Sequence, residues 1–226
     1  MAVLEAQSAA VVSYWDAVAA RYLQLFRDEF QSKPYDRQLL ATFAAQLGAD
    51  ASVCDAGCGP CGHVTRLLAD AGVDVVGVDI STRCIELAQL EQPALRFATM
   101  DIAAMDFADG ALQGLVSYYA LHYLPKSSLG AVLREFARVL RVGGSLLIVA
   151  KEGAAEGWID CPMGSGQKVF WCEFTAEELC SLAAANGFEE IVCEVREPLP
   201  EEIGCAASIS PLAAQRLKAT TELVVP

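Results

Sequence analysis

Residues 54–62, with the sequence CDAGCGPCG, contain three overlapping patterns that each indicate a different chemistry. Three cysteines have the CxxxCxxC spacing with which thiolates hold a four-iron, four-sulfur cluster: Cys54, Cys58 and Cys61. Three glycines form the GxGxxG of a dinucleotide-binding turn: Gly57, Gly59 and Gly62. Asp55 precedes the first two of these glycines in a D-x-G-x-G pattern, which places a carboxylate at the entrance of the same loop. At most one of these patterns is the working chemistry, so the rest of the sequence must discriminate among them.

Two further acids follow apolar runs downstream of this loop. Asp79 ends the run from Val73 to Val78, and Asp101 follows the run from Leu95 to Thr99. Ligands of open α/β sheets bind at the carboxyl ends of parallel strands, so acids in these places are expected to meet at one edge. An acid placed like Asp79 accepts hydrogen bonds from ribose hydroxyls, and Asp101 stands where an adenine amino group would be bound. Together they suit a nucleoside ligand without phosphates.

The elements that position these acids alternate between strands and helices. Strand-like runs occupy 52–55, 73–78, 95–99, 112–118, 145–150 and 191–196, and a further run at 168–174 follows a Gly-rich stretch. Apolar residues at helical spacing occupy 8–30, 36–47, 63–71, 81–90, 129–140 and 175–186. This alternation predicts βαβ units in an α/β fold, with a mostly parallel sheet and helices on both of its faces.

Composition favours a protein with a large core and a small-molecule partner. The 226 residues are 54% hydrophobic, and the net charge of −13 disfavours nucleic acid as a partner. The nine cysteines are scattered through apolar segments, which is typical of reduced thiols in a cytoplasmic protein. No apolar run approaches the roughly 20 residues of a membrane span, and the first residues lack the pattern of a signal peptide. We expect one cytoplasmic domain, as a monomer or homodimer, with no membrane partner and no metal.

Two of the three loop patterns fit this context poorly. Pro60 stands before the third cysteine, where cluster-binding loops usually carry an aromatic residue, and free cysteine is a common small apolar residue inside a fold. A dinucleotide fits poorly because Asp55 would face the incoming pyrophosphate. An NAD(P)-binding oxidoreductase stays open as an alternative.

Four segments, taken in chain order, resemble class I SAM-dependent methyltransferases. Residues 53–81 (VCDAGCGPCGHVTRLLADAGVDVVGVDIS) are similar to the first two motifs, and residues 95–107 (LRFATMDIAAMDF) to the third-strand segment. Residues 133–153 (LREFARVLRVGGSLLIVAKEG) resemble the helix and fifth strand, and residues 14–22 (YWDAVAARY) the helix that closes over the cofactor. The resemblance implies a Rossmann-like, doubly wound, mostly parallel seven-stranded sheet. Residues 1–48 would form an N-terminal helical cap, 49–200 the core, and 201–226 an atypical final segment.

The resemblance also implies which residues bind S-adenosylmethionine (SAM) and release S-adenosylhomocysteine (SAH). Asp55 would hold the amino-acid end, Asp79 the ribose and Asp101 the adenine. The glycine loop would let the cofactor approach the backbone. The full set of expected cofactor-binding residues is Asp55, Gly57, Cys58, Gly59, Asp79, Ile80, Asp101, Ile102 and Tyr14.

The chain departs from the family pattern in two places. Cys61 stands where the third glycine is usual, with Gly62 one place later, which suggests a turn that is one residue longer. The closing strand of the sheet is not evident, and Ile203 to Ile209 or Thr221 to Val225 are the candidates.

Two histidines and an aromatic residue each have a functional and a structural interpretation. His122 follows the fourth predicted strand and is the candidate general base, although a packed pocket wall is the alternative. His63 is interpreted as an ordinary residue of the first helical turn. Tyr14 is a candidate for cation–π contact with a sulfonium.

These observations predict a SAM-dependent methyltransferase that transfers a methyl group to a small-molecule acceptor by in-line displacement. A methyltransferase-like protein that binds SAM without turnover and serves a protein partner is the alternative from a different class.

Overall fold

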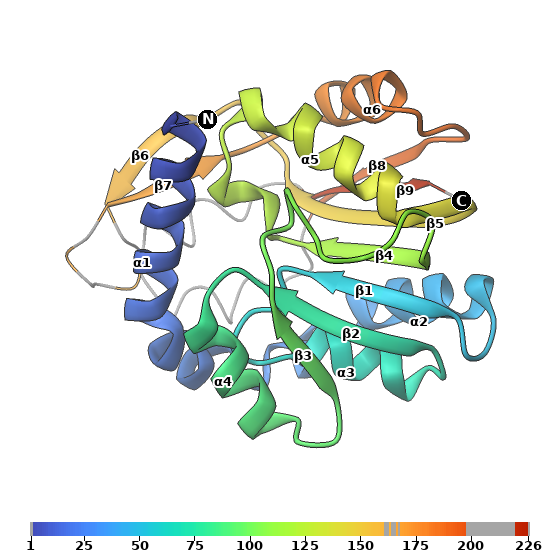
Figure 1. Ribbon diagram of the computed structural model, residues 1–226, viewed down its shortest axis with the longest axis horizontal. Coiled ribbons are helices and arrows are strands. Elements are labelled where there is room, and N and C mark those ends of the chain that lie inside the picture. Colours follow the sequence, from blue (N-terminus) through green and yellow to red (C-terminus); the bar gives the residue numbers. More distant parts are fainter. Residues whose placement is uncertain (1, 161–162, 164–165, 167, 198–219, 226) are drawn as a thin grey trace.

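A computed structural model of the protein describes residues 2–160, 163, 166, 168–197 and 220–225. Its centre is a seven-stranded sheet with the strand order β3-β2-β1-β4-β5-β9-β8 (Figure 1). Neighbouring strands from β3 to β5 run parallel, whereas β9 runs antiparallel to both β5 and β8. The strands span Ser52–Ala56 (β1), Asp74–Asp79 (β2), Arg96–Thr99 (β3), Leu112–Tyr118 (β4), Leu140–Lys151 (β5), Val192–Arg196 (β8) and Thr220–Val225 (β9). The mostly parallel α/β fold predicted from the sequence is therefore confirmed.

Helices cover both faces of this sheet (Figure 1). On one face, residues of α2 and α3 pack against inward-facing residues of β1, β2, β4 and β5. On the other face, α5 and α6 pack against the alternate residues of the same strands. The helices of these two layers span Pro34–Leu47 (α2), His63–Asp70 (α3), Lys126–Val139 (α5) and Ala176–Ala185 (α6).

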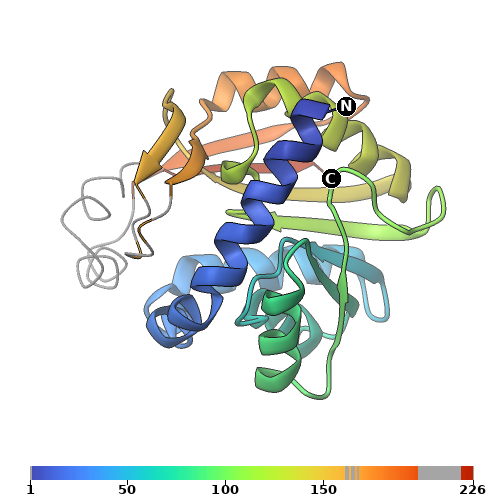
Figure 2. The same ribbon diagram turned by 60° about the vertical axis from the view of Figure 1, so that its left-hand side comes forward.

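A long first helix lies across the carboxyl ends of the strands. Helix α1 spans Ala2–Phe26, so it begins earlier than the helix predicted from residue 8. Its Ala19 and Leu23 pack beside α4, which spans Thr82–Glu91. The strand arrows of β1, β2 and β4 point toward α1, which crosses in front of that edge in the turned view (Figure 2). None of the described helices is long and apolar enough to cross a lipid bilayer.

Two short elements and a hairpin lie at the same edge. The 3-10 helix η1 (Glu29–Ser32) joins α1 to α2, and η2 (Leu121–Tyr123) follows β4. Strands β6 (Glu156–Asp160) and β7 (Lys168–Cys172) form a separate antiparallel pair. Strand β6 was not predicted, and it lies within the Gly-rich stretch that precedes residue 168.

The closing strand is the second of the two candidates. Residues 220–225 form β9 between β5 and β8, with Ile148 paired to Leu223 and Leu223 to Cys193. The other candidate, Ile203 to Ile209, lies outside the described residues. Because β9 enters between β5 and β8, the sheet departs from the all-parallel 3-2-1-4-5-6 order of classic dinucleotide-binding folds. The strand order thus counts against the NAD(P) alternative.

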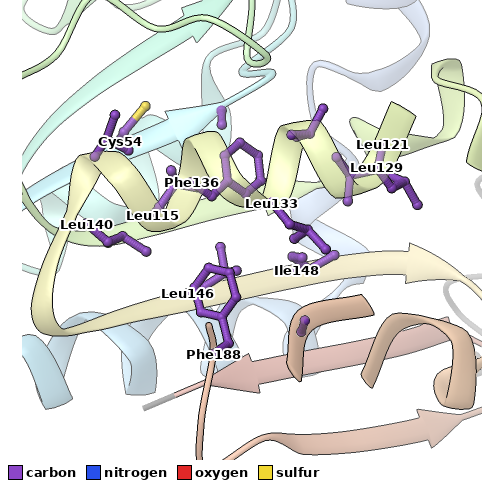
Figure 3. Packing of buried hydrophobic residues seen from close by; sticks show 14 of the residues in the cluster. Cys54, Leu115, Leu121, Leu129, Leu133, Phe136, Leu140, Leu146, Ile148 and Phe188 are labelled. Atoms are coloured by element: carbon purple, nitrogen blue, oxygen red, sulfur yellow. The ribbon is translucent and has the colours of Figure 1, made fainter. Parts of the chain in front are cut away.

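The larger core cluster lies between α5 and the sheet (Figure 3). Leu129, Leu133 and Phe136 repeat at spacings of four and three residues, which brings them to one face of α5. All three are fully buried, against Leu115 of β4 and Ile148 of β5 among others. This packing fixes β4 and β5, and so the loops at their carboxyl ends.

We expect Phe136→Ala to lower the free energy of unfolding by about 3–5 kcal/mol, because it removes a fully buried ring and leaves a cavity. Urea denaturation measures this change. Val142→Ala, at a fully exposed position, is the control and should change stability by less than about 0.5 kcal/mol. A loss below about 1 kcal/mol for Phe136→Ala would contradict the packing described.

Candidate functional site

The loop between β1 and α3 has backbone conformations that favour glycine. Gly57, Gly59 and Gly62 have φ angles of 90°, 62° and 58°. A Cβ atom on Gly57 would lie 2.3 Å from the Cβ of Ala120, whereas one on Gly59 would meet no atom within 4 Å. The loop is therefore closed against the β4–η2 loop at Gly57 and opens into free space at Gly59. The third left-handed position falls on Gly62, the N-cap of α3, which accounts for Cys61 at the usual glycine position.

The carboxylate of Asp79 is fixed by two backbone donors. Its Oδ2 accepts a hydrogen bond from Gly59 N at 3.0 Å, and its Oδ1 accepts one from Ser81 N at 2.9 Å. Burial raises the pKa of Asp79 to about 6 in spite of these two bonds. Each carboxylate oxygen still has capacity to accept a second bond. Asp79 thus joins the glycine loop to the end of β2.

Asp55 has one satisfied and one unsatisfied oxygen. Its Oδ2 accepts a hydrogen bond from Thr65 Oγ1 at 2.6 Å, while its Oδ1 is buried and has no partner among the described residues. Burial raises the pKa of Asp55 to about 6. A buried carboxylate oxygen without a donor is costly, so this atom marks a place where a ligand donor would be stabilised.

The third acid, Asp101, lies at the end of β3 and is half-buried. Its Oδ1 accepts a hydrogen bond from Ala103 N at 2.9 Å, and Ser8 Oγ of α1 lies 3.5 Å from its Oδ2. The two isoleucines of the expected cofactor-binding set, Ile80 and Ile102, are both partly buried, and Ile102 packs against the larger core cluster.

Helix α1 is tied to the end of β2 through Asp16, a residue that the sequence alone did not mark as functional. Ser81 Oγ donates to Asp16 Oδ1 at 2.6 Å, and the same oxygen accepts a hydrogen bond from Cys84 N at the start of α4. Ser81 N also donates to Asp79, so Ser81 links helix α1 to the predicted ribose anchor. The only signal in the sequence was the position of Asp16 within YWDAVAARY.

Tyr14 is almost fully buried on α1, within a group of aromatic rings. Its ring centroid lies 5.6 Å from that of Trp15 and 6.0 Å from that of Tyr123 in η2. Trp171 of β7 extends this group by an edge contact with Tyr123. The rings therefore join α1 to η2 and the β6–β7 hairpin.

His122 has both ring nitrogens engaged by backbone groups. Nδ1 lies 2.6 Å from Cys172 O, and Nε2 accepts a hydrogen bond from Lys151 N at 3.1 Å. The ring stacks on Trp171 with 4.8 Å between centroids. Burial lowers the pKa of His122 to about 4, so the ring is neutral at physiological pH. Neither nitrogen is left to accept a proton from a methyl acceptor, and this geometry favours the packed wall over the general base.

Two of the three loop cysteines pack in different clusters. Cys54 belongs to the core cluster under α5, whereas Cys61 packs with Leu23 of α1 and Cys84 of α4. Burial raises the pKa of Cys54, Cys58 and Cys61. Protonated thiols in separate clusters are poorly suited to hold iron. Among the described residues, no group of three or more histidine, cysteine or acidic side chains is placed to hold a metal ion.

A buried polar cluster lies beside the loop, and sequence reasoning missed it. His63 Nε2 lies 2.9 Å from Glu29 Oε1, and Lys33 Nζ lies 3.1 Å from Glu29 Oε2. Glu29 and His63 are both more than nine-tenths buried. The expectation that His63 is an ordinary first-turn residue does not account for the contact of its ring with Glu29.

Comparison with known proteins identifies the core of the fold. Residues 53–144 match the family model described as a methyltransferase domain. Malonyl-[acyl-carrier protein] O-methyltransferase of Pseudescherichia vulneris is 34% identical over 132 residues, which are 58% of this chain and 51% of that protein. Residues 53–144 of this chain are thus similar to a methyltransferase domain, and solved SAM-dependent methyltransferases share its fold.

A second relative and a solved structure agree with this. Demethylmenaquinone methyltransferase of Beutenbergia cavernae is 32% identical over 141 residues, or 61% of this chain and 56% of that protein. The chain thus matches about half the length of these relatives. The 1,6-didemethyltoxoflavin-N1-methyltransferase of Burkholderia thailandensis, solved with S-adenosylhomocysteine, superposes with a TM-score of 0.59 at 20% identity. That alignment covers 92% of this chain and 89% of the other, and at this identity it shows the fold alone.

The two buried acids, Asp55 and Asp79, should make the stability of the protein depend on pH. Their folded pKa of about 6 lies above the ordinary 3.8, so the protonated form is favoured in the fold. The associated stability is present below the ordinary pKa and is lost as pH rises through about 6. Relative to wild type, Asp55→Asn should therefore be more stable at about pH 8 than at about pH 4, by up to about 3 kcal/mol.

Urea denaturation at the two pH values measures this gain, and Asp79→Asn is its matched control. Asp79→Asn should show a similar pH-dependent gain in stability. The NH2 group of its amide, however, would face one of the two backbone N–H donors and could not accept a hydrogen bond from it. It should therefore be about 1–3 kcal/mol less stable than Asp55→Asn at both pH values. A pH-independent difference between wild type and Asp55→Asn would contradict the burial of this charge.

His122→Phe should lower the free energy of unfolding by about 2–4 kcal/mol, because it keeps a stacked ring but leaves Cys172 O and Lys151 N without their partner. The same denaturation assay measures it, with Trp158→Phe at a half-exposed position of the hairpin as control. Wild-type turnover should show no imidazole inflection between about pH 5 and pH 8. An inflection that His122→Phe abolishes without loss of stability would restore His122 as the base.

Proposed function

We propose that this protein transfers a methyl group from SAM to a small-molecule acceptor. The observation that carries the proposal is the set of three acids, Asp55, Asp79 and Asp101, at the carboxyl ends of three adjacent parallel strands. They surround a glycine loop that opens into free space at Gly59. The family of the core and the methyltransferase relatives support the same function.

The residues present suit SAM rather than a dinucleotide. The unsatisfied Oδ1 of Asp55 is an acceptor that suits the ammonium group of the amino-acid end. The carboxylate of Asp79 is preoriented by two N–H donors and would accept from the ribose hydroxyls. Asp101 would accept from the adenine amino group, with Ile80 and Ile102 beside the ring. Gly57, Cys58 and Gly59 would line the approach of the cofactor to the backbone.

When bound, SAM would supply a sulfonium methyl group that the acceptor takes by in-line displacement. The chain would contribute position and exclusion of water rather than acid–base chemistry, because His122 is engaged on both nitrogens. We propose that α1 is the cap over this site, since Asp16 and Ser8 reach the ends of β2 and β3. Tyr14 would act through packing of that cap, with cation–π contact as a second contribution.

We propose that the acceptor is a small, largely apolar molecule. A cleft between α1 and the β6–β7 hairpin is lined by Ala10, Val11, Tyr123, Trp158, Val169 and Phe170. None of these side chains carries a charge. The net charge of −13 makes a nucleic-acid acceptor unfavourable.

Calorimetric titration with SAH tests the cofactor site. We expect binding by the wild type and a loss of about ten-fold or more for Asp79→Ala, because two charge-assisted hydrogen bonds to the ribose are removed. Asp70→Ala, at an exposed acid at the end of α3, is the control and should bind like wild type. Unchanged affinity for Asp79→Ala would place the site elsewhere.

Incubation of a metabolite extract with labelled SAM tests the reaction, and mass spectrometry identifies the product that gains the methyl group. Asp79→Ala in the same extract controls for transfer by other enzymes. Binding of SAH without transfer to any compound in a broad acceptor panel would favour the non-catalytic alternative.

A further inference from the structure

His63 is held at the end of the glycine loop in one orientation. It is the first residue of α3, and its ring makes an edge contact with Phe30 at 4.8 Å between centroids. Its Nε2 lies 2.9 Å from Glu29 Oε1. The ring is thus fixed on one side by a carboxylate and on another by an aromatic residue.

Glu29 determines which nitrogen of this ring carries the proton. Burial alone would raise the pKa of Glu29, but the Lys33 ammonium and the His63 hydrogen bond lower it to about 2. An ionised carboxylate only accepts, so Nε2 must be the donor and carry the hydrogen. In the neutral ring, Nδ1 then presents a lone pair.

That lone pair has no partner in the part of the chain that the structure describes. His63 Nδ1 is fully enclosed and without a hydrogen bond, and the same holds for Asp55 Oδ1. Asp55 is the second-last residue of β1 and His63 the first of α3, so the two atoms belong to the two sides of the glycine loop.

Two buried acceptors beside one loop, one of them on a carboxylate, would be satisfied together by a donor with several N–H groups and a positive charge. An ammonium group has three donors and meets both needs, whereas a neutral donor leaves the carboxylate charge unbalanced. On the proposed function, the ligand of this loop carries an ammonium group at its amino-acid end.

We propose that His63 Nδ1 is a second acceptor for the ammonium group of SAM, beside Asp55 Oδ1, and that Glu29 orients it. This inference rests on the proposed function. It adds a binding residue, His63, and a positioning residue, Glu29, and it explains why an ion pair is buried next to the loop.

Two nearly isosteric variants separate this role from a structural one. His63→Asn places an amide oxygen close to the position of Nδ1 and loses the contact with Glu29. His63→Gln places an amide nitrogen close to the position of Nε2, keeps the bond to Glu29 and loses the acceptor. Arg66→Ala is the control, because Arg66 lies one turn further along α3, half-exposed, and pairs only with Asp70 among the ion pairs of the described residues.

Calorimetry measures two ligands with each variant: SAH, and 5′-methylthioadenosine, which has the same nucleoside and sulfur but no amino-acid end. We expect His63→Gln to weaken SAH binding about ten-fold or more, as for one hydrogen bond to a charged group. Its affinity for methylthioadenosine should stay unchanged, and His63→Asn should bind SAH within about three-fold of wild type. The Arg66→Ala variant should bind both ligands like wild type.

The inference is overturned if His63→Gln binds SAH like wild type, if both ligands weaken equally, or if His63→Asn loses as much SAH affinity as His63→Gln. Failure of the proposed function looks different, because wild type would then bind neither ligand.

A measurement on wild type alone covers the case in which the variants do not fold. An SAH analogue with hydrogen in place of the α-amino group should bind about ten-fold or more weakly than SAH. Equal affinities would overturn the ammonium site.

Discussion

Five backbone N–H groups donate to the last two residues of β2, and the site is organised around them. Two donate to Val78 O, two to the Asp79 carboxylate and one to Asp79 O. The donors come from the loops after β1, β2 and β3: Gly57, Cys58, Gly59, Ser81 and Met100. Ser81 then carries the connection to Asp16 of α1. The end of one strand thus sets the position of three loops and of the helix that lies across them.

This arrangement is costly for the fold. Asp55 and Asp79 are buried with raised pKa values, so each ionised carboxylate destabilises the folded protein at neutral pH. Only part of that cost is offset locally, because Asp79 accepts two N–H bonds whereas Asp55 keeps an oxygen without a donor. A cationic or hydroxyl-rich ligand would supply what the fold lacks. Binding of such a ligand would therefore relieve part of the desolvation penalty that the buried carboxylates impose on the folded chain.

The sequence was informative where function depends on residues that are close along the chain. The D-x-G-x-G pattern and the strand-end position of Asp79 follow from local rules, because a left-handed turn needs glycine and a β-branched run predicts a strand. The alternation of strands and helices predicted the mostly parallel sheet for the same reason. Strand β9 was harder to place, since the candidate segments showed no convincing alternation of apolar residues.

The residues that were missed depend on partners distant in sequence. Glu29 and His63 are 34 positions apart and meet only because η1 folds back on α3. Asp16 and Ser81 are separated by 65 positions. The sequence alone does not decide the role of His122, for a related reason. Its position after the fourth strand indicated a residue near the acceptor, but Cys172 O, 50 positions away, decides what its Nδ1 does.

The polar cluster around Glu29 reaches beyond the loop and ties the site to the far edge of the sheet. Lys33 Nζ contacts Tyr118 OH at 3.2 Å, and that hydroxyl donates to Asp36 Oδ2 at 2.7 Å. Asp36 Oδ1 in turn accepts from Arg196 of β8 at 2.7 Å.

Charges alternate in sign along this chain of contacts, from Glu29 through Lys33 and Asp36 to Arg196. Removal of any one charge leaves a buried neighbour uncompensated, which typically costs 3–5 kcal/mol. An apolar interface of the same volume would serve stability as well or better. The charged interface is therefore best explained by the Glu29 carboxylate at one end of this chain of contacts, because no apolar residue could orient His63.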